Sequence, residues 1–168
     1  QKDILIPGLH NVENYMAAIL AVEGLASDDD IRYVASHFGG VEHRIELVRV
    51  KDGVKYYNDS IASSPSRTIA GLRSFEQKII LIAGGYDKHI PYEPLAPELL
   101  AHVKTLVLMG ATGPVIEKAL RGCPGFTEGA MEILHADSMK DAVEKARAAA
   151  RPGDVVSLSP ASASFDCY

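Results

Sequence analysis

The chain has 168 residues, of which 47% are hydrophobic, and its 17 basic and 22 acidic side chains give a net charge of -5. This length suits one domain and part of another, with enough apolar residues for a buried core. Charges of both signs are spread along the chain, so no basic stripe argues for nucleic acid and no basic amphipathic face argues for a membrane. Cys123 and Cys167 match no metal or redox spacing, and such sparse cysteine use is typical of the reducing cytoplasm.

The first forty residues predict a pair of helices. "HNVENYMAAILAVEG", residues 10–24, repeats its apolar side chains at helical spacing, and "SDDDIRYVASHF", residues 27–38, has Ser27 or an early aspartate as its cap. Gly39-Gly40 follows and suggests a hinge. The chain begins almost inside a strand and stops at "SPASASFDCY", which is too short to add a closing helix. We therefore expect a segment of a longer polypeptide.

After residue 44 the pattern changes from helical to β. "RIELVRVKDGVKYYN" alternates with period two, which predicts a hairpin of strands 45–50 and 54–57 around Lys51-Asp52-Gly53. Short apolar runs then alternate with helical patterns, so the fold class is α/β, with a mostly parallel sheet flanked by helices. The expected strands are 78–83, 104–110, 131–134 and 154–159, and the expected helices lie near 65–75, 95–102, 113–121 and 138–149, with Ser138 as the last cap.

Four loops follow the predicted strands and are the candidates for a binding site, because open α/β sheets bind ligands beyond the carboxyl ends of their strands. None of them contains a P-loop pattern or a G-x-G-x-x-G turn, so this sheet carries no triphosphate cradle of its own. Gly84-Gly85 is open to two interpretations, a phosphate nest or a tight strand exit. The four loops are "NDSIASSP" at 58–65, "GGYDKH" at 84–89, "GATGP" at 110–114 and "SPASAS" at 159–164.

Four stretches carry a family resemblance. "PGLHNVENYMAA", residues 7–18, resembles the H-N-x-x-N segment of Mur ligases, the ATP-dependent amide-forming enzymes of peptidoglycan synthesis. "YYNDSIASSPSRTIAGL", "ILIAGGYDK" and "LSPASASFD" are similar, in that order, to the carboxy-terminal domain of the family. The resemblance spans nearly the whole chain. It is strongest to the branch that adds D-glutamate to UDP-N-acetylmuramoyl-L-alanine, whose turn reads N-D-S-K-A-T-N or similar.

The resemblance implies three domains: a UDP-binding domain, a central ATPase domain with the P-loop, and a Rossmann-like ligase domain. Residues 1–40 would then be the C-terminal part of the central domain, and residues 41–168 the ligase domain, truncated at its end. In the family, ATP phosphorylates the substrate carboxylate and the amine of D-glutamate attacks the acyl phosphate. The P-loop and the Mg²⁺ ligands would lie upstream of Gln1, and no catalytic residue or metal ligand is expected in this chain.

The resemblance also assigns residues to the nucleotide. Asn11 and Asn14 match the adenine-side asparagines, and at i and i+3 on a helix they share a face. Helix capping by His10 or Asn11 is the alternative interpretation. Arg44 matches the arginine that reaches the ATP phosphates, and Asp59 matches the carboxylate that holds the ribose hydroxyls.

The residues assigned to D-glutamate come from three loops. Lys88 matches the lysine that pairs with the amino acid, and Ser164 with the Phe165 backbone matches the group that receives a carboxylate. Ser63 keeps a hydroxyl where the family often has threonine. The sequence departs from the family at Ile61, where a lysine is usual, and an isoleucine cannot pair with a carboxylate.

Arg67 or His89 could compensate for Ile61, which is a hypothesis that the sequence leaves open. Two other functions also stay open. A different amide ligase, such as a folylpolyglutamate synthase, would share H-N-x-x-N and the α/β domain, but we would not expect it to combine N-D-S with S-P-A-S-A-S. A non-catalytic α/β module that binds a ligand is the alternative from another class. None of the six histidines falls at a metal-ligand spacing.

Overall fold

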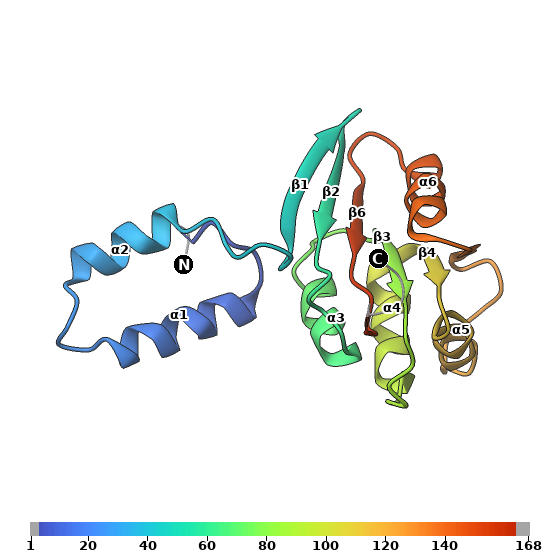
Figure 1. Ribbon diagram of the computed structural model, residues 1–168, viewed down its shortest axis with the longest axis horizontal. Helices are drawn as coiled ribbons and strands as arrows, with labels where there is room; N and C mark the ends of the chain where they lie inside the picture. Colours follow the sequence, from blue (N-terminus) through green and yellow to red (C-terminus); the bar gives the residue numbers. More distant parts are fainter. Residues whose placement is uncertain (1–3, 164–168) are drawn as a thin grey trace. The chain divides into compact units, whose positions relative to one another are not determined.

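The computed structural model describes residues 4–163, and the chain divides into two compact units, one ending at Val41 and the other beginning at Glu42 (Figure 1). The first unit holds α1 (Leu9–Ala21) and α2 (Asp28–His37), which confirms the predicted helix pair. Ser27 caps α2, as expected. Its hydroxyl accepts the Asp30 N–H at 3.2 Å and the Asp30 carboxylate accepts the Ser27 N–H at 3.0 Å, which together make a capping box.

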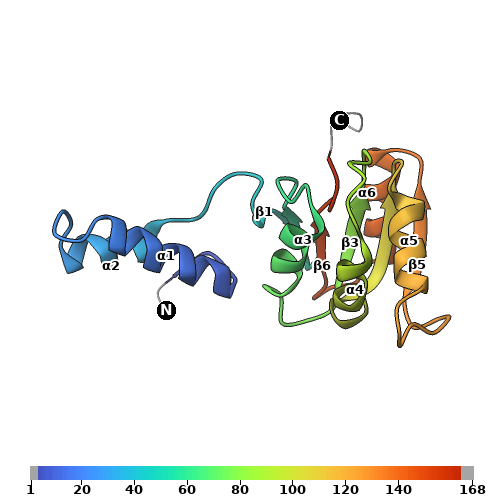
Figure 2. The same ribbon diagram turned by 90° about the horizontal axis from the view of Figure 1, so that it is seen from below.

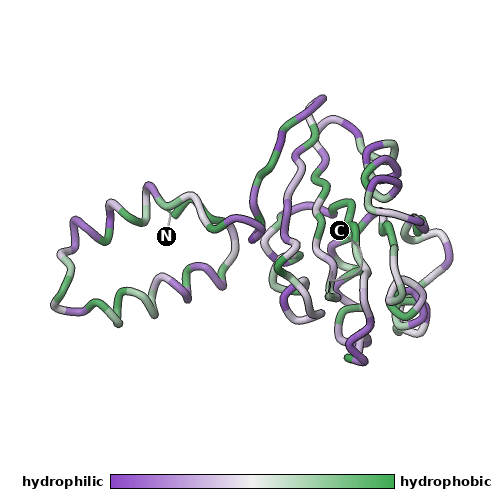
Figure 3. Tube along the Cα trace, in the orientation of Figure 1, coloured by the Kyte–Doolittle hydropathy of each residue, from purple (hydrophilic) through white to green (hydrophobic). Residues whose placement is uncertain are grey.

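The helix pair lacks a hydrophobic core of its own. Asn11 is the one buried residue that α1 and α2 contain, while Met16 is 60% exposed and Leu20 is 69% exposed. The Tyr15 hydroxyl is buried without a hydrogen-bond partner. In Figure 3 hydrophobic and hydrophilic residues alternate along both helices. An apolar groove runs between the helices, lined by Tyr15, Ala18, Ile19, Val22, Ala26, Asp30, Ile31 and Val34.

The second unit is built on one sheet with the strand order β1-β2-β6-β3-β4-β5. β1 and β2 are antiparallel, and every other neighbouring pair is parallel, so the expected mostly parallel α/β fold is confirmed. β6 lies between β2 and β3 although it is last in the chain. The strands are β1 (Glu46–Lys51), β2 (Val54–Asn58), β3 (Ile79–Gly84), β4 (Val103–Met109), β5 (Glu132–Ala136) and β6 (Val155–Leu158).

The hairpin turn is shorter than predicted. Lys51 pairs with Val54, so the loop contains only Asp52 and Gly53. Their φ angles of 53° and 76° are both positive, as a type I′ turn requires, and Asp-Gly is one of its preferred sequences. Lys51 therefore belongs to the strand, because this turn needs only two residues to reverse the chain.

Helices cover both faces of the sheet (Figure 2). α3, α4, α5 and a short 3-10 turn share one core cluster, and α6 packs on the other cluster. α3 ends three residues before the predicted boundary. The N–H groups of Ser74 and Phe75 bond to the carbonyl oxygens of Gly71 and Leu72, three residues back, whereas an α-helix needs bonds to the fourth residue back. The helices are α3 (Pro65–Leu72), α4 (Ala96–His102) with the 3-10 turn Glu93–Leu95 before it, α5 (Gly113–Arg121) and α6 (Met139–Ala149).

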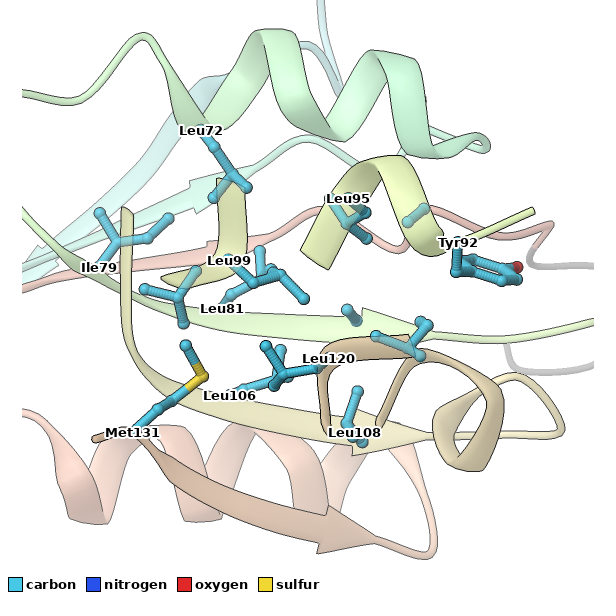
Figure 4. Packing of buried hydrophobic residues seen from close by; sticks show 14 of the residues in the cluster. Leu72, Ile79, Leu81, Tyr92, Leu95, Leu99, Leu106, Leu108, Leu120 and Met131 are labelled. Atoms are coloured by element: carbon cyan, nitrogen blue, oxygen red, sulfur yellow. The ribbon is translucent and has the colours of Figure 1, made fainter. Parts of the chain in front are cut away.

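β3 shows why the central strands read as unbroken apolar runs. Leu81 and Ala83 belong to the core cluster of α3, α4 and α5 (Figure 4), and Ile80 and Ile82 belong to the cluster of α6. Each of these side chains is at most 2% exposed. Because successive residues point to opposite faces, a strand with helices on both faces needs apolar residues at every position.

Candidate functional site

The loops that follow β2, β3 and β6 lie side by side at one edge of the sheet. Since these strands run in parallel, their carboxyl ends meet at that edge. Main-chain bonds tie the loops together: the Asp59 N–H reaches Leu158 O at 2.8 Å, and the Ala161 N–H reaches Ala62 O at 2.9 Å. The Tyr86 N–H reaches Ala163 O at 2.8 Å. Three of the four candidate loops thus lie together, at residues 58–65, 84–89 and 159–163.

A buried carboxylate joins the first and last of these loops. Asp59 is 4% exposed, and its Oδ1 accepts the Ile45 N–H at 3.2 Å. Its Oδ2 accepts the hydroxyl of Ser159 at 2.8 Å. The Ser159 Oγ is also 3.0 Å from the Oγ1 of Thr68 on α3. A Cβ on Gly71 would lie 2.8 Å from Asp59 Oδ2, so α3 approaches the carboxylate through a glycine.

The surroundings of Asp59 change its acidity. Burial raises the pKa of the carboxyl above its ordinary value of 3.8, because the charged form loses its hydration. The bonds from Ser159 and Ile45 and the positive charge of Arg44 lower the pKa in part. The carboxylate therefore depends on these three neighbours for its stability as an ion.

Arg44, the predicted phosphate contact, lies beside this carboxylate on an unusual stretch of backbone. The residues on either side, His43 and Ile45, have φ angles of 65° and 47°. A β-branched residue at positive φ is a genuine outlier. The Arg44 side chain is exposed, while Ile45 is only 7% exposed. The buried neighbour thus anchors an exposed arginine at the loop edge.

Lys88 and Ser63, two residues predicted for the amino acid, lie together. The Nζ of Lys88 is 3.4 Å from the main-chain oxygen of Ser63. Arg67, on the first turn of α3, donates from Nη1 to the main-chain oxygen of Ile61 at 3.2 Å. Two cations therefore contact the same short loop, each through a carbonyl oxygen. His89 instead lies near Asp87, with 3.4 Å between Nδ1 and Oδ2.

Glycines let the strand exits pack closely. A Cβ on Gly84 would collide with the carbonyl oxygen of Met109, and one on Gly85 would collide with that of Ala163. The space beside this glycine pair is filled by main chain, which favours the tight strand exit over the phosphate nest. Thr112 stands beside it, accepting the Gly85 N–H at 2.9 Å.

Three buried hydroxyls lock the same region. The Ser162 Oγ lies 2.7 Å from Thr112 Oγ1 and 2.8 Å from the Tyr92 hydroxyl. Tyr92, Thr112 and Ser162 are each at most 2% exposed. Because the hydroxyls satisfy one another, they can be buried at little cost. This network holds the described part of the last loop, residues 159–163, in place.

Asn11 and Asn14 are adjacent in the first unit. The Asn11 Nδ2 donates to Pro7 O at 2.6 Å, and its Oδ1 accepts from Asn14 Nδ2 at 3.3 Å. Asn11 is 6% exposed, and Asn14 is exposed. Gly8 occupies the N-cap position of α1, and no side chain caps the helix there. Asn11 therefore bonds to the segment that precedes α1, at Pro7, and does not act as its cap.

Ser164 and Phe165 lie outside the described residues. Within residues 4–163, no group of three or more His, Cys, Asp or Glu side chains is arranged to hold a metal ion. None of the helices in that range has the length and hydrophobicity needed to cross a membrane.

The sequence did not predict the buried partners of the site, namely Thr68, Ser159 and the three hydroxyls of Tyr92, Thr112 and Ser162. The run "SPASAS" signalled a loop of small polar residues. It did not tell that Ser159 and Ser162 are buried, and Ser159 meets its partner Asp59 across 100 residues of chain. Only the position of β6 beside β2 brings them together.

Comparison with known proteins identifies the family. The family described as "Mur ligase, glutamate ligase domain" matches residues 43–162. UDP-N-acetylmuramoylalanine--D-glutamate ligase of Clostridium beijerinckii is 54% identical over 168 residues, which is 100% of this chain and 37% of that protein. The ligase of the same name from Acetivibrio thermocellus is 58% identical over 169 residues, 99% of this chain and 36% of that protein. The chain thus spans little more than a third of these relatives.

Solved structures share the fold at low identity. A pseudomurein peptide ligase type C from Methanothermus fervidus has a TM-score of 0.70 at 16% identity, covering 92% of this chain and 34% of that chain. Mycobacterium tuberculosis folylpolyglutamate synthase complexed with ADP has a TM-score of 0.69 at 15% identity, covering 95% of this chain and 39% of that chain. These likenesses show the fold alone. Since the family match covers most of the sheet unit, the chain belongs to the Mur ligase family and carries its glutamate ligase domain.

Proposed function

We propose that this chain is part of an ATP-dependent ligase that joins D-glutamate to UDP-N-acetylmuramoyl-L-alanine in peptidoglycan synthesis. The observation that carries the proposal is the 54% and 58% identity, over essentially the whole chain, with relatives named for that activity. A folylpolyglutamate synthase shares the fold at 15% identity, so that alternative has less support. Because ATP is a proposed substrate, we place the ligase in the cytoplasm.

The two units fit two domains of such a ligase. We propose that residues 1–40 are the C-terminal part of its central ATP-binding domain and residues 41–168 its ligase domain. The division of the chain after Val41 supports this boundary. The exposed apolar side chains of α1 and α2 support it too, because such a surface is normally covered by further protein.

The proposed reaction has two steps. A carboxylate oxygen of UDP-N-acetylmuramoyl-L-alanine attacks the γ-phosphorus of ATP and ADP leaves. The D-glutamate amine then attacks the acyl carbon, and phosphate leaves as the nitrogen loses a proton and the amide forms. Phosphoryl transfer depends on positioning and charge stabilisation, with Mg²⁺ as the usual partner of the phosphates. We propose that the Mg²⁺ ligands lie upstream of Gln1, as the family resemblance implies; among residues 4–163 no three His, Cys, Asp or Glu side chains are arranged to hold a metal ion.

On the nucleotide side we propose Asn11, Asn14, Arg44 and Asp59. Asn11 and Asn14 stand together on α1 and offer amides to an adenine. Arg44 has an exposed guanidinium for the phosphates. We propose Asp59 for the ribose hydroxyls, which would have to reach a side chain that is 4% exposed and already accepts one bond at each oxygen, from Ile45 and from Ser159; a carboxylate has further lone pairs for them.

On the amino-acid side we propose Lys88, Ser63, Ser164 and the Phe165 backbone. D-glutamate brings two carboxylates, and both need neutralising while its amine stays free to attack. Lys88 and Ser63 are adjacent, which supports a shared contact. Arg67 contacts the Ile61 carbonyl oxygen, so a guanidinium stands beside the position where the family usually has lysine. We therefore favour Arg67 over His89 as the compensating cation.

The test is steady-state ligation by the longer enzyme, with D-glutamate and ATP varied separately. Lys88→Ala should raise KM for D-glutamate roughly tenfold or more, because a charge-assisted bond to a carboxylate is lost. Lys140→Ala is the control, since Lys140 lies on α6 with its side chain 87% exposed. If the unmodified enzyme does not ligate D-glutamate, the proposed function is refuted.

Arg67→Ala belongs in the same assay. We expect KM for D-glutamate to rise while KM for ATP stays within about twofold, and Arg67→Lys should recover part of the loss because it keeps the charge. Arg73→Ala is the matched control, since Arg73 follows the same helix but pairs with Glu98. An unchanged KM for D-glutamate in Arg67→Ala would remove Arg67 from the site.

A further inference from the structure

We propose that Ser159 is a positioning residue for Arg44, acting through the buried carboxylate of Asp59 and the main chain of Ile45. The proposal deepens the proposed function and rests on it, because it takes Arg44 as the group that meets the nucleotide phosphates. Ser159 itself touches no ligand in this scheme: it is 3% exposed and lies behind Asp59.

Ser159 has two polar side-chain neighbours. A carboxylate can only accept, so the Ser159 hydroxyl donates to Asp59 Oδ2 at 2.8 Å. The Ser159 Oγ also lies 3.0 Å from Thr68 Oγ1 on α3. α3 thereby holds Ser159, and Ser159 holds one oxygen of the carboxylate. The other oxygen is left facing the Ile45 N–H at 3.2 Å.

That last bond anchors backbone that would otherwise be unfavourable. His43 and Ile45 both have positive φ, and Ile45 is β-branched, so this stretch needs outside contacts to persist. Asp59 holds Ile45 on one side of Arg44. On the other side the His43 carbonyl oxygen accepts the Ile61 N–H at 3.2 Å. The main chain of Arg44 is thus fixed at both ends while its side chain is exposed.

Removal of the Ser159 hydroxyl should therefore act at a distance. Asp59 Oδ2 would lose its donor inside the protein, where an unsatisfied charged group is costly. The carboxylate could rotate toward other donors and release Ile45. Arg44 would then sample more orientations, and the cost should appear in nucleotide binding.

The experiment is a double-mutant cycle in the longer enzyme, with KM for ATP as the readout. Ser159→Ala alone should raise KM for ATP roughly tenfold. In an Arg44→Ala background the same substitution should raise KM for ATP clearly less, because the part of its effect that runs through Arg44 is gone and only the part that runs through the ribose contact of Asp59 remains. In a Lys88→Ala background the full effect should remain. Ser157→Ala is the matched control, a buried serine on β6 outside the Asp59 contacts.

The outcomes separate the two proposals. An unmodified enzyme that does not ligate D-glutamate would count against the proposed function. A normal enzyme in which Ser159→Ala has no effect on KM for ATP, or the same effect with and without Arg44, would overturn the positioning role alone. If Ser159→Ala does not fold, Ser159→Cys takes its place in the cycle, because it keeps the volume and weakens the donor.

Discussion

At the scale of single residues, Asp59 shows how much a side chain depends on its surroundings. In the sequence it stands in a polar loop, where a carboxylate is expected to meet solvent or ligand. In the structure it is 4% exposed and has two donors, one of them a backbone N–H and the other a serine hydroxyl. Its burial makes ionisation costly, and its neighbours offset part of that cost.

This gives a pH prediction for stability. Because burial raises the folded-state pKa of Asp59 above 3.8, the folded chain binds this proton more tightly than the unfolded chain. The stabilisation is complete below 3.8 and is lost as the pH rises through the folded-state pKa. The free energy of unfolding of wild type minus that of Asp59→Asn should therefore increase as the pH falls from 7 toward 4. Urea unfolding of both proteins at each pH measures this difference. A difference independent of pH would contradict the raised pKa of Asp59.

At the scale of elements, glycines at the strand exits decide how closely the loops pack. Gly84 ends β3 with a φ of 110°, in a region that L side chains rarely adopt. The main chain of Met109, at the end of β4, fills the space where its Cβ would be. The loops can therefore lie against one another only because this residue has no side chain.

Gly84→Ala should accordingly cost about 3 kcal/mol or more, from backbone strain and a collision with main chain that cannot move aside. Gly125→Ala is the control, because Gly125 also has positive φ, at 92°, but has nothing within 4 Å of the added Cβ. There the cost should be about 1 kcal/mol, from conformation alone. Chemical denaturation of the two variants compares them, and equal costs would show that the collision is relieved.

At the scale of the whole molecule, the two units differ in how completely their apolar side chains are buried. The sheet unit has two core clusters, one on each face, whereas α1 and α2 have exposed apolar side chains and a groove between them. We proposed above that further protein covers these helices and that the loop edge of the sheet supplies groups for the ligands. The loops of that edge carry no phosphate cradle of their own.

We therefore expect the 168-residue chain alone to show no ATP-dependent ligation of D-glutamate, whereas the longer enzyme should be active. Phosphate release from ATP with both substrates present measures this. Ligation by the isolated chain would contradict the division of roles between domains. Tight binding of ADP or D-glutamate by the isolated chain would instead favour the alternative of a stand-alone binding module.

Much of the fold could be predicted from the sequence because its signals are local. The caps Ser27 and Ser138, the hairpin, whose turn was predicted one residue too long, and the apolar central strands each depend on neighbours within a few residues. Errors were confined to boundaries, such as the early end of α3 at Leu72. The resemblance supplied the candidate site residues, and Lys88 and Ser63 do lie together.

The sequence by itself determined the element types, the α/β class and the family, because periodicity, caps and motifs are written in consecutive residues. Tertiary structure alone decided that β6 runs between β2 and β3. That placement puts Ser159 against Asp59 across 100 residues, buries the carboxylate and connects it to the backbone beside Arg44. The physical reason is that burial and hydrogen bonding depend on which strands become neighbours, and sequence spacing does not encode that choice.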